Sequence, residues 1–527
     1  MSSQVRQTPA ALPHAADPRP GKEKAAQSRE EMVRSLVAAT SVALLAIANY
    51  IFWIHNYFAA DSWALVGSIS QPDWSLDALL PFRQVPHRIN STFYYSPVYT
   101  AVLWLAFKLG GFAPERYHLL LIALHVGATL LLFVAALQLT QSRWKATIAA
   151  AIFAVHFGNT ETVGWIGAIT HPLTGFFAAL AFATYLRFLA SGRRVWWTAA
   201  MVALLASALC QATALPWFAI LGLLDIYHSR KEGGPPGLGR RLWVLMGVLA
   251  LVLALQIPTL RIGPSTSYNY QLGPWVVMNL FFYPASMVLP MLEGPAVTIT
   301  RDLVLAPTNQ DAFIRLMGMT DAFGLLLTCG LVVVAAALLW TRGGWVARFS
   351  LVGFGLSMTP FVLLNGQGYR YMYPLLMFFS IAMASVVVDL HRRLERESRA
   401  AALAILAIVP LFLLLSFAES QRQLFWWQQA GLVTHRTLLQ LREMQPELPK
   451  GAKVVFGGLP DTLQNTNAEV WRNGITEAVQ VVYGDRTLKV QAFTREETER
   501  LFREELKGAP NTFGFVWEDW QLKRIAP

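Results

Sequence analysis

Two carboxylates stand at the edges of long apolar segments, where a charge costs free energy unless it faces water or a partner. Asp61 lies in "FAADSWALVG", directly after an apolar run, and Glu161 lies in "VHFGNTETVGW", ahead of another. A carboxylate within hydrogen-bond distance of a reacting hydroxyl can take its proton. Two plainer interpretations stay open. Asn159, Thr160 and Glu161 together could cap a helix and stabilise its positive end, and Asp61 could be a solvated loop residue.

The segments that carry these carboxylates are unusually apolar. Of the 527 residues, 54% are hydrophobic and 14% are charged, whereas about a quarter of the residues of a soluble domain are charged. Apolar runs of roughly 18–22 residues, enough to cross about 30 Å of hydrocarbon, recur along the chain. They are too long and too apolar for barrel strands, so helices are expected. We predict about eleven transmembrane helices, at residues 33–55, 117–140, 146–158, 170–190, 196–210, 214–228, 242–261, 321–341, 347–365, 371–390 and 400–418.

The basic residues predict how these helices are oriented. The net charge of +11 would suggest nucleic-acid binding in a soluble protein, but here the Lys and Arg residues gather in short stretches between apolar runs. With eleven spans, all of these stretches fall on one side, which the positive-inside rule assigns to the cytoplasm. They are the N-terminal tail, Arg143 with Lys145, Arg193 with Arg194, residues 228–241, Arg342 with Arg348, and residues 391–399. We therefore expect a multi-pass protein with a cytoplasmic N-terminus and no nucleic-acid partner.

The remaining parts of the membrane region are assigned by composition. Residues 1–30 are polar and rich in Pro and Ala, which predicts a disordered cytosolic tail. Residues 31–418 form the predicted transmembrane domain. Two apolar segments, "SPVYTAVLWLAFKLGG" and the proline-interrupted "PWVVMNLFFYPASMVLP", would break the parity of the spans. We predict that both lie on the outer side as interfacial or re-entrant helices, within long outer loops at residues 56–116 and 262–320.

The last part of the chain, residues 419–527, has a different pattern. The segments "AKVVFGGLP", "AVQVVYG" and "TFGFVWE" are typical of strands. In "TREETERLFREELK", Thr494 precedes Glu497 by three residues, which predicts a capping box at the start of a helix. The predicted fold class is therefore an all-α polytopic membrane protein with a small C-terminal α/β domain outside the cytoplasm.

The sequence carries little sign of a metal or a disulfide. Cys210 and Cys329 both lie inside apolar runs and give no ligand spacing. His171, which precedes Pro172, is more typical of packing at a helix end than of a metal ligand, because no second His or Cys stands at ligand spacing. We predict no cofactor, while a requirement for a divalent metal stays open.

Four segments together resemble a known family. They are "FYYSPVYTAVLWLAFKLGGFAPERYHLLLIALHVGATLLLF", "AVHFGNTETVGWIGAITHPLTGFFAALAFATYLRFL", "LLASALCQATALPWFAILGLLDIY" and "GYRYMYPLLMFFSIAMA". Their order, spacing and hydropathy resemble the GT-C membrane glycosyltransferases. Bacterial relatives of protein O-mannosyltransferases, and of the transmembrane mannosyltransferases that carry TPR domains, are the most similar. The resemblance covers roughly residues 50–390, and Tyr117, His118 and His125 match one of the family's blocks at the same spacing.

The resemblance implies an inverting transfer of a sugar from a polyprenyl phosphate to an acceptor at the outer face of a bacterial inner membrane. In that family an acid of the first outer loop acts as general base or positions the acceptor, and Asp61 matches its place. Glu161 would then face the same cavity and orient the acceptor or share the proton. The partners that this implies are the polyprenyl-phosphate sugar donor, membrane lipid, and an acceptor glycan, lipid or protein.

A lipid phosphate as leaving group implies positive charge near the outer leaflet. Arg370, in "GQGYRYMYP", and Arg261, in "IPTLRIG", lie at the outer ends of predicted spans and could hold phosphate oxygens. The alternative is that both arginines only extend to the interface, as long basic side chains do. The further residues that we expect to line the pocket are Tyr95, His118, His171 and Tyr371.

The chain departs from the family pattern at four positions. Ser96 replaces an arginine before Pro97, Gln211 and Ala212 replace a Lys-Glu pair, and His171 replaces an acid. These changes are compatible with a different sugar, or with a site that binds without turnover. Two other functions also stay open: a transporter or flippase of lipid-linked sugars, and a polymerase or ligase that uses a polyprenyl diphosphate.

Overall fold

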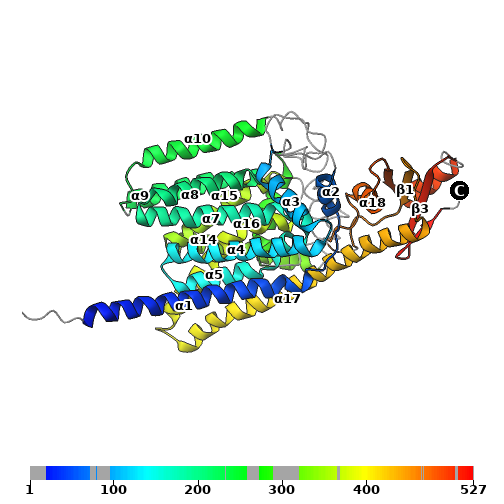
Figure 1. Ribbon diagram of the computed structural model, residues 1–527. Helices are drawn as coiled ribbons and strands as arrows, with labels where there is room; N and C mark the ends of the chain where they lie inside the picture. The colour runs from blue at the N-terminus through cyan, green and yellow to red at the C-terminus, as the bar shows by residue number, and fades with distance from the viewer. Residues whose placement is uncertain are drawn as a thin grey trace, which may run out of the picture.

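The chain forms a bundle of helices lying side by side, with a small sheet beyond one end of it (Figure 1). The computed structural model describes residues 19–71, 79, 95–231, 233–257, 272–288, 320–364, 368–463, 466, 468–504 and 509–525. The bundle consists of α1 (Arg19–Tyr50), α4 (Pro114–Thr140), α5 (Arg143–Val155), α7 (Thr170–Ser191), α8 (Arg194–Ala208), α9 (Pro216–Lys231), α10 (Leu238–Gln256), α14 (Thr320–Arg342), α15 (Trp345–Val362), α16 (Tyr373–Leu394) and α17 (Arg399–Met444). The predicted mostly helical fold with several apolar helices and a small C-terminal sheet is confirmed.

Seven helices in the described ranges are long and apolar enough to cross a membrane. They span Arg29–Trp53, Pro114–Thr140, Thr170–Ser191, Leu238–Gln256, Trp345–Val362, Tyr369–Leu394 and Arg399–Met444. Helices α5, α8 and α9 are shorter, with 13, 15 and 16 residues, and the count of eleven spans stays a prediction.

Helix α5 shows how a short apolar helix fits into this bundle. It has 13 residues, and a helix of that length is about 20 Å long, less than the hydrocarbon thickness. Nine of its residues are buried, most of them alanine, and it packs against α1, α4 and α16. Small side chains let neighbouring helices approach closely. Helix α5 is therefore enclosed by protein, and it delivers the segment that follows it, with Glu161, to the interior of the bundle.

A buried ion pair joins α9 to α10. The Asp225 side chain is fully buried and accepts hydrogen bonds from the Arg241 guanidinium at 2.8 and 2.9 Å and from the Tyr185 hydroxyl at 2.8 Å. A buried carboxylate is tolerated when it is paired in this way. Arg241 also donates to the carbonyl oxygens of Pro235 and Pro236, so the pair fixes the connection between the two helices.

Helix α1 extends into the segment that was predicted to be a disordered tail, and the predicted tail itself stays a prediction. Helix α1 begins at Arg19, so residues 19–30 of that segment are helical, whereas residues 1–18 lie outside the described residues. The reason is composition: Lys, Glu, Ala and Gln dominate this stretch, and all are good helix formers. Pro20 stands in the first turn, the position that best tolerates proline.

Three short helices belong to the predicted outer loops. They are α2 (Asp61–Ile69), α3 (Pro97–Gly110) and α11 (Pro274–Ser286). Helices α3 and α11 have 14 and 13 residues, which is less than the roughly 20 residues that a span requires. Their interfacial or re-entrant placement stays a prediction. Much of both loops, at residues 72–78, 80–94, 258–271 and 289–319, lies outside the described residues.

One continuous helix links the bundle to the C-terminal sheet. Helix α17 has 46 residues and extends from the bundle to the sheet (Figure 1). The predicted boundary between residues 418 and 419 therefore falls inside a helix. The predicted domain limits themselves stay predictions.

The C-terminal sheet has four strands in the order β2-β1-β3-β4. Strand β1 (Lys453–Gly457) pairs in parallel with β2 (Lys489–Phe493) and β3 (Thr512–Glu518), and β4 (Gln521–Arg524) pairs antiparallel with β3. The strands predicted in "AKVVFGGLP" and "TFGFVWE" are β1 and β3.

The strand predicted in "AVQVVYG" is wrong, because these residues belong to α18 (Ile475–Tyr483). The buried residues of this helix are Ile475, Ala478 and Val479, which follow the i, i+3, i+4 spacing of a helix face. Gly484 ends the helix in the left-handed conformation, with φ of 65°. That C-cap glycine was a signal for a helix in the sequence.

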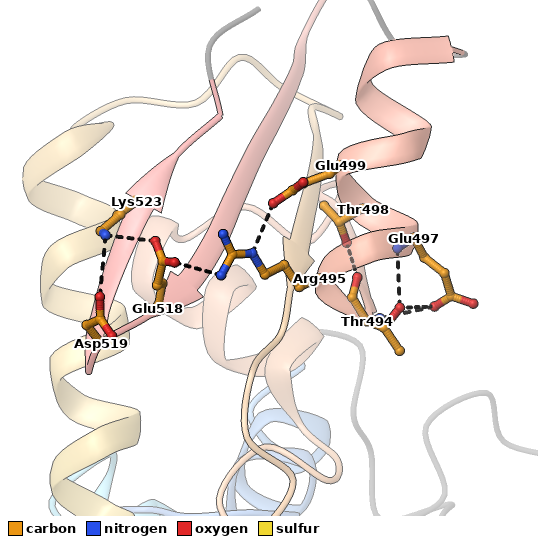
Figure 2. Close-up of polar contacts among 8 residues, drawn as sticks. All are labelled: Thr494, Arg495, Glu497, Thr498, Glu499, Glu518, Asp519 and Lys523. Carbon is orange, nitrogen blue, oxygen red and sulfur yellow. Dashed lines mark hydrogen bonds and ion pairs between the residues drawn. The ribbon is translucent and has the colours of Figure 1, made fainter.

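The predicted capping box is present at the start of α19 (Arg495–Glu504) (Figure 2). The Thr494 amide donates to Glu497 Oε2 at 3.1 Å, and the Glu497 amide donates to Thr494 Oγ1 at 3.3 Å. Figure 2 also shows Arg495 between Glu499 and Glu518. The contact between Arg495 and Glu518 attaches α19 to β3.

Candidate active site

Asp61 is the first residue of α2, which lies next to α18 at the end of the bundle nearest the C-terminal sheet (Figure 1). Its Oδ1 atom accepts a hydrogen bond of 2.7 Å from the Asn473 side-chain amide. The preceding amide, of Ala60, donates to the Val470 carbonyl oxygen at 2.8 Å. Both contacts come from Glu469–Gly474, which we call the docking segment. Asp61 is thus held by a part of the chain that follows it by about 400 residues.

The backbone before Asp61 is strained. Ala60 has φ of 48° and ψ of −132°, a region that residues with a Cβ rarely occupy. Such strain costs about 1–3 kcal/mol and persists when the surroundings enforce it, most often at functional sites. Here the hydrogen bond to Val470 and the burial of Ala60 enforce it.

Glu161 lies in the short helix α6 (Thr160–Gly164) and is 5% exposed. Its Oε2 atom accepts a hydrogen bond of 2.9 Å from the Arg370 amide, and its Oε1 atom pairs with the Arg370 guanidinium. The Asn159 side chain makes no capping hydrogen bond to α6, and its amide nitrogen donates to the Phe153 carbonyl oxygen at 2.6 Å. The buried charge of Glu161 is therefore compensated by Arg370.

Aromatic rings enclose Arg370, which lies in the 3-10 helix η7 (Tyr369–Met372). Its guanidinium carbon is 4.8 Å from the ring centre of Tyr371 and 5.5 Å from that of Trp165. Gly368 lies close behind: a Cβ atom there would be 3.1 Å from Arg370 Nη1 and 3.4 Å from Glu161 Oε2. The guanidinium is thus held at one orientation by a carboxylate, two ring faces and tight backbone packing.

Trp165 connects the surroundings of Arg370 to those of Asp61. Its Nε1 atom donates to the Ala59 carbonyl oxygen at 3.2 Å. Its ring stacks on Trp427 of α17, with centroids 5.2 Å apart and planes 14° apart. One side chain therefore touches the loop that leads to Asp61, the Arg370 guanidinium and the long helix that carries the C-terminal sheet.

A third carboxylate, Glu469, belongs to the same site. It is 8% exposed and pairs with Arg472 at 2.7 Å. Burial raises the pKa of Glu469, the nearby Arg370 and Arg472 guanidiniums lower it, and the Asp61 and Glu161 carboxylates raise it further. The carboxylates of both predicted acids, Asp61 and Glu161, therefore affect the pKa of Glu469.

The sequence analysis missed Glu469 and Asn473. Their loop follows the carboxyl end of β1, and loops at that edge of parallel strands often carry function. That position was the one signal available in the sequence. It did not show that the loop would reach a part of the chain about 400 residues away.

Several buried polar atoms at this end have no hydrogen-bond partner among the described residues. They are the Asn56 amide, Ser62 Oγ, Trp63 Nε1, Thr160 Oγ1 and Tyr283 Oη. Buried polar groups are nearly always bonded, to protein or to ordered water. These atoms therefore mark where water or a bound molecule would make hydrogen bonds. In the part of the chain that the structure describes, no group of three His, Cys, Asp or Glu residues is arranged to hold a metal ion.

The predicted pocket residues fall into two groups. His171 and Tyr371 are both buried and lie edge to face with ring centroids 5.5 Å apart, next to Arg370. His118 Nε2 contacts the Asn56 carbonyl oxygen at 3.0 Å, and the Tyr95 backbone is bonded to the Gln256 side chain of α10 at 2.8 and 2.9 Å. These two hold loops to helices. Arg261 lies outside the described residues, and the functional roles of all the predicted site residues stay predictions.

Comparison with known proteins identifies two relatives. No protein-family model matches the chain. The Drosophila melanogaster proteins Protein O-mannosyl-transferase Tmtc1 and Tmtc2 are each 26% identical to it, over 449 and 211 residues. These matches cover 76% and 37% of this chain, and 49% and 22% of the two relatives. The chain thus spans about half the length, or less, of the curated relatives that it matches. It is homologous to them, which confirms the resemblance to transmembrane mannosyltransferases.

Comparison with solved structures gives two examples of similar chains. One is the archaeal oligosaccharyltransferase AglB from Archaeoglobus fulgidus in complex with an inhibitory peptide and a dolichol-phosphate, with 14% identity, a TM-score of 0.47, and coverage of 92% of this chain and 69% of that chain. The other is ArnT from Cupriavidus metallidurans bound to undecaprenyl phosphate, with 15% identity, a TM-score of 0.42, and coverage of 92% and 97%. At these scores no residue role is transferred from them.

We predict that Glu161 and Arg370 stabilise the fold as a coupled pair. Glu161→Ala or Arg370→Ala alone leaves a buried charge without its partner and should reduce the free energy of unfolding by about 3–5 kcal/mol. The double variant should lose clearly less than the sum, by at least about 1 kcal/mol. Unfolding of the detergent-solubilised chain measures this. Arg422→Ala, in the more exposed pair with Glu419, is the control and should cost under about 1 kcal/mol. Additive losses would contradict the pairing.

We also predict a pH dependence from Glu469. Because burial raises the pKa of Glu469 in the folded chain above its ordinary value, the folded state binds this proton more tightly than the unfolded state does. The stabilisation is fully present below about pH 4.5 and is lost as the pH rises through the folded pKa. Glu469→Gln should flatten this part of the stability profile, whereas Glu443→Gln, at an exposed carboxylate, should not. Thermal unfolding from pH 4 to pH 8 tests it, and parallel profiles for all three proteins would refute it.

Proposed function

We propose that this protein transfers a sugar from a polyprenyl-phosphate donor to an acceptor hydroxyl at the outer face of the membrane, with inversion at the anomeric carbon. Homology to the two O-mannosyl-transferases supports the reaction class. The observation that carries the proposal is the link that Trp165 makes between the turn before Asp61 and the buried Glu161–Arg370 pair: its Nε1 atom bonds the Ala59 carbonyl oxygen, and its ring lies against the Arg370 guanidinium.

Asp61 is the general base of the proposed reaction. Its carboxylate is partly exposed, and Oδ1 is already bonded to Asn473. The acceptor oxygen attacks the anomeric carbon while its proton moves to the Asp61 carboxylate. At the same time the bond between the anomeric carbon and the phosphate oxygen breaks, and the electron pair leaves with the lipid phosphate. One carboxylate is sufficient, because the phosphate is a good leaving group.

Arg370 stabilises the departing phosphate in this proposal. A guanidinium presents its N–H donors in a fixed fork that matches phosphate oxygens. The ion pair with Glu161 and the ring faces of Trp165 and Tyr371 hold that fork at one orientation, which reduces the cost of organising it during the reaction. Glu161 acts through Arg370 in this account and is a positioning residue.

The membrane location follows from the carrier. A polyprenyl tail stays in lipid, so its phosphate reaches a protein site at the edge of the bilayer. The basic connectors of the bundle predict a cytoplasmic location for the opposite end. We therefore propose that the site and the C-terminal sheet lie outside the cytoplasm.

Sugar transfer by the purified chain tests the proposal. The assay compares the parent protein with the variants Asp61→Asn and Glu161→Gln, each purified in detergent. Each protein is incubated with radiolabelled mannosyl polyprenyl phosphate and with peptides that contain serine and threonine. The radioactivity transferred to the peptide is then measured. Asp61→Asn should lower kcat by about 10²–10⁴-fold, because it removes the base. Glu443→Gln is the control for a lost exposed carboxylate.

The outcomes separate the alternatives. Transfer by Asp61→Asn at the parent rate would remove Asp61 as the base. Transfer from a polyprenyl diphosphate donor, with none from the monophosphate, would favour a polymerase or ligase. Movement of the labelled lipid across a vesicle membrane, with no sugar transfer by the parent, would favour a transporter.

A further inference from the structure

The docking segment, Glu469–Gly474, contacts the turn that carries Asp61 through three of its residues. The Val470 carbonyl oxygen accepts the Ala60 amide, and the Asn473 amide bonds Asp61. Gly474 has φ of 88°, and a Cβ atom there would lie 2.9 Å from the Ala60 oxygen, the Ala64 nitrogen and Trp63 Cβ. The approach of the two backbones therefore requires glycine at this position.

The adjoining helix extends this contact. Helix α18 follows the docking segment and packs on α2. A Cβ atom on Gly67 would lie 2.5 Å from Glu477 Cβ, so these two helices also meet closely. Because α2 begins at Asp61, the position of its first residue depends on where the C-terminal part docks.

The contact between Asn473 and Asp61 is exposed to solvent, so its contribution differs from that of a buried packing contact. The Asn473 residue is exposed, and a hydrogen bond that water can replace adds little to net stability. The effect of the bond on Asp61 is directional instead. An amide N–H that holds Oδ1 fixes the rotation of the carboxylate, and thereby fixes where Oδ2 points.

The buried neighbours of Asn473 show that this segment faces the site. Glu469, four residues earlier, is buried and close enough to Asp61, Glu161 and Arg370 for their charges to act on it. The nearby Trp63 Nε1 and Ser62 Oγ, on α2, are buried without a hydrogen-bond partner among the described residues. Buried polar groups of the segment and of α2 therefore lie on both sides of the contact that holds Asp61.

We propose that Asn473 is a positioning residue for the reaction: its side-chain amide holds Oδ1 of Asp61 so that Oδ2 is aimed at the acceptor hydroxyl. The C-terminal part of the chain thereby completes the site of the membrane bundle. This inference rests on the proposed function, because it assigns Asp61 the role of base.

The test compares substitutions at residue 473 in the full-length chain, in detergent, with the transfer assay described above. Asn473→Ala removes the donor and should lower kcat about tenfold, with the KM for the lipid donor unchanged, since Asn473 does not touch that substrate. Asn473→Asp places a second carboxylate beside Asp61 and should lower kcat further. In an Asp61→Asn background, Asn473→Ala should have no additional effect, because the two residues act as one unit.

A matched control and a second measurement exclude a purely structural effect. Gln491→Ala removes an exposed amide from the edge strand β2 and should leave kcat unchanged. For Asn473→Ala, hydrogen–deuterium exchange in α2, residues 61–69, and the melting temperature should both stay close to those of the parent, because the exposed bond orients a side chain and adds little to stability.

Each outcome decides the inference. Faster exchange in α2 together with a loss of kcat would show that Asn473 acts by holding the helix and not by orienting the carboxylate. An unchanged kcat for Asn473→Ala, or a kcat loss that adds fully to that of Asp61→Asn, would show that Asn473 does not act through Asp61. If the parent itself transfers no sugar, the proposed function has failed and this role falls with it.

Discussion

The buried ion pair between Glu161 and Arg370 is the constraint on which the rest of the site depends. A carboxylate that is 5% exposed is costly in a bundle of apolar helices unless a partner compensates it. The partner lies 209 positions away, so the pair joins the turn after α5 to the start of α16. Trp165 then extends this connection to the loop before Asp61. The ion pair that compensates this buried charge, together with Trp165, therefore holds three segments of the chain together.

The C-terminal part is joined to this site by a stiff connection. Helix α17 packs on α5 and α6 in the bundle and on β4 near its end. Trp427, on the same helix, stacks on Trp165. The sheet is therefore connected to the bundle by a continuous helix and not by a flexible linker. It is presented to the end of the bundle where Asp61 lies, and the docking segment contacts that residue directly.

Local features of the sequence predicted local structure well. Thr494 and Glu497 predicted a capping box that the structure contains, because both partners lie within one turn. The apolar runs predicted long helices because that signal, too, lies within one continuous segment. The strand prediction for "AVQVVYG" was wrong, because a short apolar run with β-branched residues fits either a strand or a buried helix face. In the folded chain these residues pack as one face of α18.

Long-range pairing could not be predicted in the same way. The sequence identified Asp61, Glu161 and Arg370 as residues of interest, but it paired Arg370 with a phosphate and not with Glu161. Nothing local in "AEVWRNG" indicates that Glu469 and Asn473 reach α2. Such contacts arise because α17 carries the sheet to the end of the bundle where α2 lies. The hydrophobic periodicity of the sequence predicts helices and strands but not contacts of this kind.

The most direct test of the central claim is a cryo-electron microscopy structure of the full-length chain with undecaprenyl phosphate bound. The account predicts phosphate oxygens within about 3 Å of the Arg370 guanidinium, with the Asp61 carboxylate and Glu469 bordering the same space. A phosphate bound elsewhere, with Asp61 and Glu161 facing separate environments, would contradict it.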